Sequence, residues 1–205
     1  METKNGLLVH LGCFDQPVEN WYNTDITPHI WISRVSFLPY ALYRMNLISS
    51  GRYGQHRRGV FKKIHYLNLK KKLPFKDDSV NAFFSSHVIE HLYIHHTESL
   101  LREILRTLVP GGSVRFVLPD LEYCMRLYDP ADPRKFLETI FENTQRGLEK
   151  NQHKWMYTAP YLIRLLKETG FSFPCQREYQ KTDFIPFIPL DNRPENSFYV
   201  EARKP

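Results

Sequence analysis

Residues 73–112 read LPFKDDSVNAFFSSHVIEHLYIHHTESLLREILRTLVPGG, and this stretch decides the fold. An apolar strand, VNAFFSS, precedes a short polar elbow and a helix from about Thr97 to Leu108. Thr97 is the expected N-cap of this helix, and Pro110-Gly111-Gly112 turns the chain into the next strand. Apolar residues at helical spacing form a stripe that should pack on a sheet: Leu100, Leu101, Ile104, Leu105 and Leu108. The stretch therefore predicts one module of a parallel α/β sheet.

The rest of the chain alternates strand-like and helix-like segments in the same way. Further strands are expected at residues 7–12, 20–26, 63–68, 113–119, 183–188 and 197–203. Further helices are expected at residues 33–48, 133–149 and 160–168, the last ending at Gly170. Pro39 should end or kink the first of these helices. Counted with VNAFFSS, these segments predict seven strands in a doubly wound α/β fold.

Length and composition fit one domain over residues 1–205, since 42% of the 205 residues are hydrophobic. The cysteines, Cys13, Cys124 and Cys175, form no CxxC pair, so we expect neither a disulfide framework nor a zinc knuckle. No apolar run approaches the roughly 18 residues of a membrane span, and the first residues lack the apolar segment of a signal peptide. We therefore expect a cytoplasmic protein. Its net charge of +6 permits an anionic partner.

Several motifs resemble those of class I S-adenosylmethionine-dependent methyltransferases. Residues 73–112 resemble the signature "LPF…HV.EH…L.E..R.L.PGG" of that family. Leu11-Gly12-Cys13 and residues 21–26 resemble a subgroup of short bacterial, type 11-like members, as do HKWMYT at 153–158 and SFYVEARK at 197–204. The resemblance covers nearly the whole chain except about residues 30–62. It implies a Rossmann-like, mostly parallel seven-stranded sheet with an antiparallel C-terminal strand pair, S-adenosylmethionine as cofactor, and methyl transfer.

The resemblance assigns cofactor contacts to residues at the carboxyl ends of the strands, where ligands bind in open α/β sheets. Gly12 lets backbone approach the ligand, and Asp25 can accept both hydrogen bonds of a ribose diol. The implied set is Gly12, Cys13 and Phe14 after the first strand, Asp25 after the second, Asn68 and Leu69 (adenine) after the third, and Ser86 and His87 (methionine end or substrate) after the fourth. The loop after the first strand lacks the second glycine typical of the family and is too short for a full helix.

Two histidines are candidates for the chemistry itself. His153 is a candidate general base for an acceptor hydroxyl, because an imidazole titrates near neutrality, and packing against Trp155 or Tyr157 is the alternative. His91, with Glu90, either anchors the elbow by hydrogen bonds or contacts substrate. The family's N-methylating D/N-P-P-Y motif is absent after the fourth strand. We therefore expect a hydroxyl of a glycan or small molecule as acceptor.

Two other functions compete with this one. His87-Val88-Ile89-Glu90-His91 matches the H-x-x-E-H motif of zinc peptidases, but a zinc site needs both histidines on one helix. His87 is expected in the elbow, so no metal site is predicted. The second competitor is a methyltransferase-like fold without catalysis that serves as a binding or scaffold module.

The segment least like the family is basic. A basic insertion or lid is expected at about residues 30–62, and the basic residues continue to 72: Arg52, His56, Arg57, Arg58, Lys62, Lys63, Lys70, Lys71 and Lys72. A solvated loop is one interpretation, and a landing surface for a phosphate-bearing acceptor such as a nucleotide sugar, an anionic glycan or RNA is another. Because Tyr53 is the one aromatic residue placed for base stacking, a nucleic acid partner is not expected.

Overall fold

The computed structural model describes residues 6–141 and 152–205. In this part of the chain a seven-stranded sheet has the order β3-β2-β1-β4-β5-β7-β6. The strands are β1 (Leu8–Leu11), β2 (Tyr22–Asp25), β3 (His65–Tyr66), β4 (Val80–Ser86), β5 (Leu108–Pro119), β6 (Ser172–Arg177) and β7 (Ser197–Arg203). The first five run parallel, and β7 is antiparallel to both β5 and β6. The predicted doubly wound α/β fold, with its antiparallel C-terminal pair, is confirmed.

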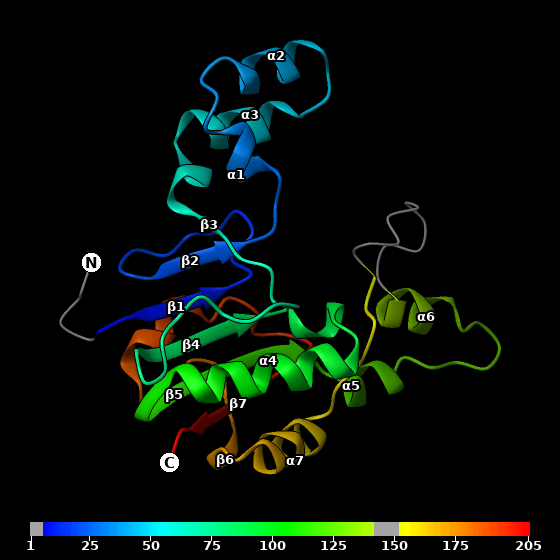
Figure 1. Ribbon diagram of the computed structural model, residues 1–205. Helices are drawn as coiled ribbons and strands as arrows, with labels where there is room; N and C mark the ends of the chain where they lie inside the picture. Colours follow the sequence, from blue (N-terminus) through cyan, green and yellow to red (C-terminus); the bar gives the residue numbers. More distant parts are fainter. Residues whose placement is uncertain (1–5, 142–151) are drawn as a thin grey trace.

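One face of the sheet is covered by α4 (Ile94–Thr107) and α7 (Ala159–Thr169), which lie together in Figure 1. The predicted stripe of α4 packs as expected, with Leu100, Leu101 and Ile104 buried in the main hydrophobic core. α7 begins where the Thr158 side chain accepts a hydrogen bond from the Tyr161 amide and ends at Gly170, whose φ is +106°. The helical period of these segments thus located the larger core correctly.

The N-terminus of α4 differs from the prediction. The helix starts at Ile94, one turn before the expected start, and its N-cap residue Tyr93 makes no side-chain capping bond. Thr97 lies inside the helix and is buried, with its hydroxyl donating to the carbonyl of Ile89 at 3.4 Å and accepting from the Tyr157 hydroxyl at 3.0 Å. The expected N-cap threonine is therefore a buried link between α4 and the segment before α7.

The opposite face carries a second, smaller core under the 3-10 helix η5 (Ile185–Leu190). Trp21, Phe187, Leu190 and Tyr199 are among its buried residues. The expected strand at 183–188 is wrong, because this segment forms η5 and the sixth strand is β6. Pro186 and Pro189 lack the amide donors that a strand ladder needs, and an isolated apolar run does not tell a strand from a short helix.

A buried ion cluster fastens the loop after η5 to β5 and β7. The guanidinium of Arg115 is fully buried, and its Nε donates to Oδ1 of Asp191 at 2.9 Å. Its Nη1 donates to Oε1 of Glu201 at 2.6 Å. Buried charges of this kind are tolerated where each is paired and hydrogen-bonded. The two carboxylates therefore make Arg115 acceptable in the middle of a strand.

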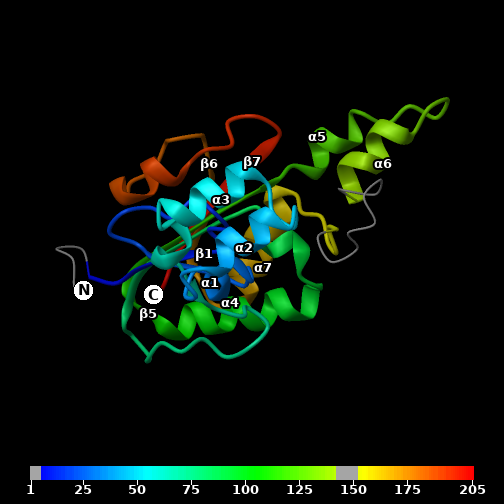
Figure 2. The same ribbon diagram turned by 90° about the horizontal axis from the view of Figure 1, so that it is seen from above.

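The chain between β2 and β3 forms a separate group of helices, which Figure 1 shows above β2 and β3 and Figure 2 shows in front of the sheet when the molecule is seen from above. These are α1 (His29–Ile32), α2 (Leu38–Arg44), α3 (Ser50–Arg57) and η1 (Val60–Lys63). The single helix expected at 33–48 is wrong: Pro39 lies in the first turn of α2, where a missing amide does no harm, and so begins a helix. Ile30, Phe61 and Ile64 bury against Cys13, which joins this group to the loop after β1.

Three short helices complete the described chain: η2 (Ile89–His91), α5 (Leu121–Met125) and α6 (Arg134–Phe141). The helix expected at 133–149 corresponds to α6, and its residues 142–149 lie outside the described residues. All three cysteines are free thiols. Within residues 6–141 and 152–205, no helix combines the length and apolar character that crossing a membrane requires.

Candidate functional site

The parallel strands β1, β2, β4 and β5 all end at the same edge of the sheet. The chain leaves β1 toward β2 on one side, whereas β4 lies on the other side of β1. Connections therefore diverge between β1 and β4, which is the switch point at which open α/β sheets bind ligands. The predicted contact residues Gly12, Asp25 and Ser86 stand at or just beyond the ends of β1, β2 and β4.

Gly12 is required by its own surroundings. Its φ is +67°, a left-handed conformation that glycine adopts without steric cost. A Cβ atom at this position would lie 2.4 Å from Cγ2 of Val88. The side chain of Val88, in the elbow after β4, thus fills the space beside Gly12. Residues 13–21 contain neither helix nor strand, which agrees with the expectation that the loop after the first strand is too short for a full helix.

Cys13 and Phe14 follow Gly12 but face different surroundings. Cys13 is buried, and burial, reinforced by the nearby Asp25 carboxylate, raises the pKa of its thiol. A neutral buried thiol is a packing group and not a nucleophile. Phe14 has a φ of +49° and remains 48% exposed, so its ring is available to a ligand.

The Asp25 carboxylate holds the ends of β1 and β2 together. Its Oδ2 accepts the main-chain N–H of Phe14 at 2.9 Å, and its Oδ1 accepts that of Thr27 at 2.7 Å. Burial raises the pKa of Asp25, and the backbone hydrogen bonds from Phe14 and Thr27 act in the opposite direction. Since each carboxylate oxygen has two lone pairs, both can accept a further donor.

Helix α3 is tied to the same loop. Nη1 of Arg52 and Nε2 of Gln55 donate to Oδ2 of Asp15, at 3.0 and 2.9 Å. The guanidinium of Arg52 also lies 4.8 Å from the ring centroid of Phe14, within cation–π range. These contacts bring the basic segment to the carboxyl edge of the sheet.

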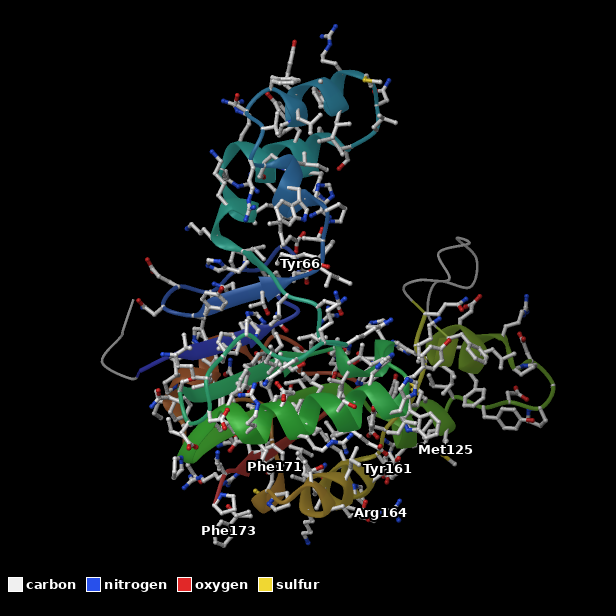
Figure 3. The ribbon with its side chains drawn as sticks, viewed as in Figure 1. Tyr66, Met125, Tyr161, Arg164, Phe171 and Phe173 are labelled. Carbon is white, nitrogen blue, oxygen red and sulfur yellow. The ribbon has the colours of Figure 1, made fainter. Side chains whose placement is uncertain are left out.

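A further contact to the helical group is made at β3, where the rings of Trp31 and Tyr66 lie 5.9 Å apart and each is about half exposed. Figure 3 shows Tyr66 between the sheet and the helices above it.

Two histidines of the helical group form a chain that the sequence did not reveal. The Nδ1 of His56 lies 2.6 Å from the Ser33 hydroxyl, and its Nε2 lies 3.0 Å from Nδ1 of His29. Burial, with smaller contributions from His29 and Arg52, lowers the pKa of His56 to about 4. The imidazole of His56 is thus neutral at physiological pH, and a positive charge there is unfavourable.

The residues expected at the adenine have structural roles in the described contacts. Oδ1 of Asn68 accepts the main-chain N–H of Lys70 at 3.0 Å and closes a turn. Leu69 is buried in the main core. Their assignment as cofactor contacts stays a prediction of the family resemblance.

At the end of β4, Ser86 is half-buried and His87 adopts a φ of +53°. The Nε2 of His87 lies 2.9 Å from the Ser197 hydroxyl, which connects the elbow to the start of β7. His87 precedes η2 and is not part of a helix. The expectation that it lies in the elbow is confirmed, and the H-x-x-E-H residues do not form the one-helix pair of a zinc peptidase.

The structure brings His91 and His153 together, although sequence reasoning proposed them separately. Their ring centroids lie 5.1 Å apart, and each offers a ligand atom within 4.8 Å of the other and of the Glu90 carboxylate. Glu90 has no exposed surface. The sequence suggested that Glu90, with His91, anchors the elbow or contacts substrate, and its place beside His153 was missed.

Surface cavities of about 230 and 650 Å³ lie beside β6, at the opposite end of the strand order from β3. Arg177 lines both of them. No predicted site residue lines either cavity, so neither cavity is part of the candidate site at the carboxyl edge of the sheet.

Comparisons with known proteins agree with this architecture. Residues 47–116 match a family model described as "Methyltransferase domain". The match begins within the segment expected as an insertion and ends in β5. An uncharacterised protein of Saccharomyces cerevisiae, YBR225W, is 37% identical in an alignment of 121 positions that covers 51% of this chain and 13% of that protein. The chain therefore spans only a small part of the length of this curated relative.

Solved structures resemble the whole chain. An S-adenosylmethionine-dependent methyltransferase from Mesorhizobium loti has a TM-score of 0.57 at 18% identity, over 100% of this chain and 93% of that one. A phosphoethanolamine N-methyltransferase 2 from Haemonchus contortus, solved with S-adenosyl-L-methionine, has a TM-score of 0.56 at 15% identity, over 99% of this chain and 50% of that one. With the strand order, these likenesses show that the chain has the Rossmann-like fold of these S-adenosylmethionine-dependent methyltransferases, and about a third of it, residues 47–116, is similar to the methyltransferase family model.

Proposed function

We propose that this protein binds S-adenosylmethionine at the carboxyl edge of its sheet and transfers the methyl group to a hydroxyl of a glycan or small molecule. The observation that carries the proposal is the Asp25 carboxylate at the end of β2, beside the switch point. The backbone N–H groups of Phe14 and Thr27 orient it, and its oxygens can accept further hydrogen bonds from the hydroxyls of a ribose. The residues at this edge therefore fit the nucleoside part of the cofactor.

The methionine end of the cofactor has fewer protein groups to hold it. Gly12 is the single glycine of the loop after β1, and the side chain of Val88 packs against it. Residues 13–21, which lead from β1 to β2, contain no helix, so this loop presents no helix N-terminus to the cofactor carboxylate. Ser86 and His87, at the end of β4, are the proposed contacts on this side. We expect the ribose contacts of Asp25 to contribute most of the affinity.

When bound, S-adenosylmethionine supplies a methyl group on a sulfonium, and its thioether sulfur is the leaving group when an acceptor oxygen takes the methyl in line. The chain must position the acceptor and accept its proton. His153 and His91 are the proposed proton acceptors, because imidazoles titrate near neutral pH and these two lie together past the end of β4. The absence of the N-methylating motif after β4 supports an oxygen acceptor.

The basic segment supports an acceptor with negative charge. Arg52 reaches the carboxyl edge through Asp15 and Phe14, and Arg57, Arg58 and Lys62 are its exposed or half-exposed neighbours. Positive charges at the rim of a site raise the local concentration of an anionic substrate. A phosphate-bearing small molecule or an anionic glycan fits this surface.

A second function, a binding or scaffold module without catalysis, is favoured by one observation. The loop after β1 has neither the second glycine nor the helix that typical methyltransferases use around the cofactor. Calorimetry with S-adenosylmethionine and S-adenosylhomocysteine separates the two functions. Binding of either ligand supports the enzyme. If neither ligand binds at about millimolar concentration, which corresponds to a binding free energy weaker than about −4 kcal/mol, the proposed enzyme function is overturned.

The variant Asp25→Ala tests the proposed contact directly. It removes the ribose acceptors, and we expect the affinity for S-adenosylhomocysteine to fall roughly 10-fold or more, since each lost hydrogen bond to a charged group is worth about 1.5–3 kcal/mol. Glu168→Gln is the matched control, because Glu168 is an exposed carboxylate on α7. An unchanged affinity of a folded Asp25→Ala protein would contradict the assignment.

A further inference from the structure

The cluster of Glu90, His91 and His153 has the composition of a metal site. Glu90 and His91 come from η2, and His153 comes from the segment before α7. One ligand atom from each lies within 4.8 Å of the other two. We infer that these three side chains bind a divalent transition-metal ion such as Zn²⁺. The site uses His153 in place of His87, so it is not the H-x-x-E-H site that the sequence motif offers.

Main-chain hydrogen bonds hold the two contributing segments against each other. The amides of Lys154 and Trp155 both donate to the carbonyl oxygen of Glu90, at 2.7 and 3.1 Å. Farther along, the main chain of Tyr157 accepts the amide of Leu121 at 3.1 Å. These bonds place His153 beside η2 without using the cluster's own side chains. A site whose ligands are positioned by backbone contacts loses little entropy when the ion binds.

The hydrogen bonds of the two rings favour the tautomer that binds metal. Nδ1 of His153 lies 2.9 Å from the carbonyl oxygen of Ile140. Nδ1 of His91 lies 3.4 Å from that of Gln152. A carbonyl oxygen only accepts, so in each neutral ring Nδ1 carries the proton and Nε2 carries the lone pair. Metal-binding histidines are commonly oriented by such a bond from the other ring nitrogen.

The Glu90 carboxylate supplies the charge. It is fully buried, and a buried carboxylate is stabilised by a nearby cation. His87 is the neighbouring titratable group on the elbow, with Nδ1 3.7 Å from Oε1 of Glu90. One carboxylate and two neutral imidazoles place a single negative charge around a divalent ion.

The ligand types select the metal. Two imidazoles and one carboxylate form the three-residue set of catalytic zinc sites, whose fourth position stays open. Mg²⁺ prefers oxygen ligands and is disfavoured here. Metal–ligand bonds of about 2.0–2.2 Å require ligand atoms within roughly 4 Å of one another. Small side-chain rotations therefore complete the site.

The use of the metal rests on the proposed methyl transfer, whereas its binding does not. An acceptor hydroxyl at the open position loses its proton more easily, because a divalent ion lowers the pKa of a bound hydroxyl. The oxygen then forms a bond to the methyl carbon, the carbon–sulfur bond breaks with its electron pair returning to sulfur, and the proton leaves to solvent. With the ion bound, His91 and His153 are its ligands, and the release of the proton to solvent replaces their proposed role as proton acceptors.

Metal titration of purified, tag-free and chelator-treated protein tests the site. We expect calorimetry with Zn²⁺ alone to show one equivalent bound, and Co²⁺ to produce visible absorption bands in the same stoichiometry. His153→Ala and Glu90→Gln should each weaken binding roughly 10-fold or more, as loss of a ligand costs at least as much as loss of its supporting partner. His95→Ala, an exposed histidine of α4, should bind as the wild type does.

Circular dichroism of each variant establishes that it is folded, and Glu90→Gln retains the shape of the side chain if His153→Ala does not fold. No binding of either ion, or unchanged binding by both folded variants, overturns the inference. Calorimetry with S-adenosylhomocysteine on the metal-free protein is a separate measurement. Cofactor binding without metal binding removes the metal site alone, and metal binding without cofactor binding removes the proposed function alone.

Discussion

The main-chain N–H of Phe14 donates a hydrogen bond of 2.9 Å to Oδ2 of Asp25, so one carboxylate holds the loop after β1 against the end of β2. In a loop with a single glycine and no helix, this bond helps to fix the backbone path, together with the bond from the Cys13 amide to the carbonyl of Thr24. The carboxylate that we propose for the ribose is thus also a structural group. Affinity for the cofactor and order in the loop should change together when Asp25 is altered.

Gly12→Ala should destabilise the protein more than Gly111→Ala. Both glycines have positive φ, +67° and +76°, so both substitutions carry the left-handed cost of about 1–2 kcal/mol. Only Gly12 has a neighbour in the way, Cγ2 of Val88 at 2.4 Å from the added Cβ, whereas Gly111 has none within 4 Å. Urea denaturation measures the difference, and Val88→Ala added to Gly12→Ala should recover part of it. Equal destabilisation by both single variants would contradict the steric account.

Arg115→Leu should be strongly destabilising. Removing the guanidinium leaves Asp191 and Glu201 without their buried cation, and breaking a buried pair costs about 3–5 kcal/mol. Arg164→Leu is the control, since Arg164 and Glu168 form an exposed pair at 3.8 Å that contributes about 0.5 kcal/mol or less. The free energy of unfolding in urea distinguishes them. A loss below about 1 kcal/mol for Arg115→Leu would show that water reaches the two carboxylates.

Stability should decrease as the pH falls from 6.5 toward 4. Burial lowers the pKa of both His10 and His56 from 6.5 to about 4, so the unfolded chain binds more protons than the folded one in this window. Below pH 6.5 this difference favours unfolding, by about 2 kcal/mol for His10 at pH 5, and His56 acts in the same direction. Urea midpoints at pH 7 and pH 5 measure the change. His56→Gln should reduce the pH dependence, and an identical pH profile would contradict the role of His56.

Arg52→Met should loosen α3 without unfolding the protein. The substitution removes the bond to Asp15 and the contact with the ring of Phe14, which are partly exposed and worth about 1 kcal/mol or less in stability. Hydrogen exchange of the amides in α3 should become faster, because they open locally more often. Arg57→Met, on the exposed side of the same helix, should leave the exchange unchanged. Equal rates in both variants would mean that Arg52 does not tether the helix.

Strong local periodicity made much of the fold predictable. The apolar run of β4 and the apolar stripe of α4 are long enough to identify a strand and a helix. β4 forms where expected, and α4 forms with the expected buried stripe but starts one turn earlier. Short segments were less predictable. Residues 183–188 are apolar enough for a strand, but Pro186 within them and Pro189 just after them have no main-chain N–H to donate. The segment Ile185–Leu190 forms a 3-10 helix instead. Pro39 was read as a helix breaker, although in the first turn it starts α2.

Local patterns in the sequence predict the alternation of strands and helices in the parallel part of the sheet, the larger core, and the polar residues that follow the strands, because these features depend on periodicity and on neighbours along the chain. Tertiary structure alone decided which of those residues meet. Val88 fills the space beside Gly12, and Asp25 is bonded to Phe14. His153 joins Glu90 and His91 because the amides of Lys154 and Trp155 bond to a carbonyl in a distant helix. Contacts between segments far apart in the chain follow from packing geometry, which no local pattern encodes.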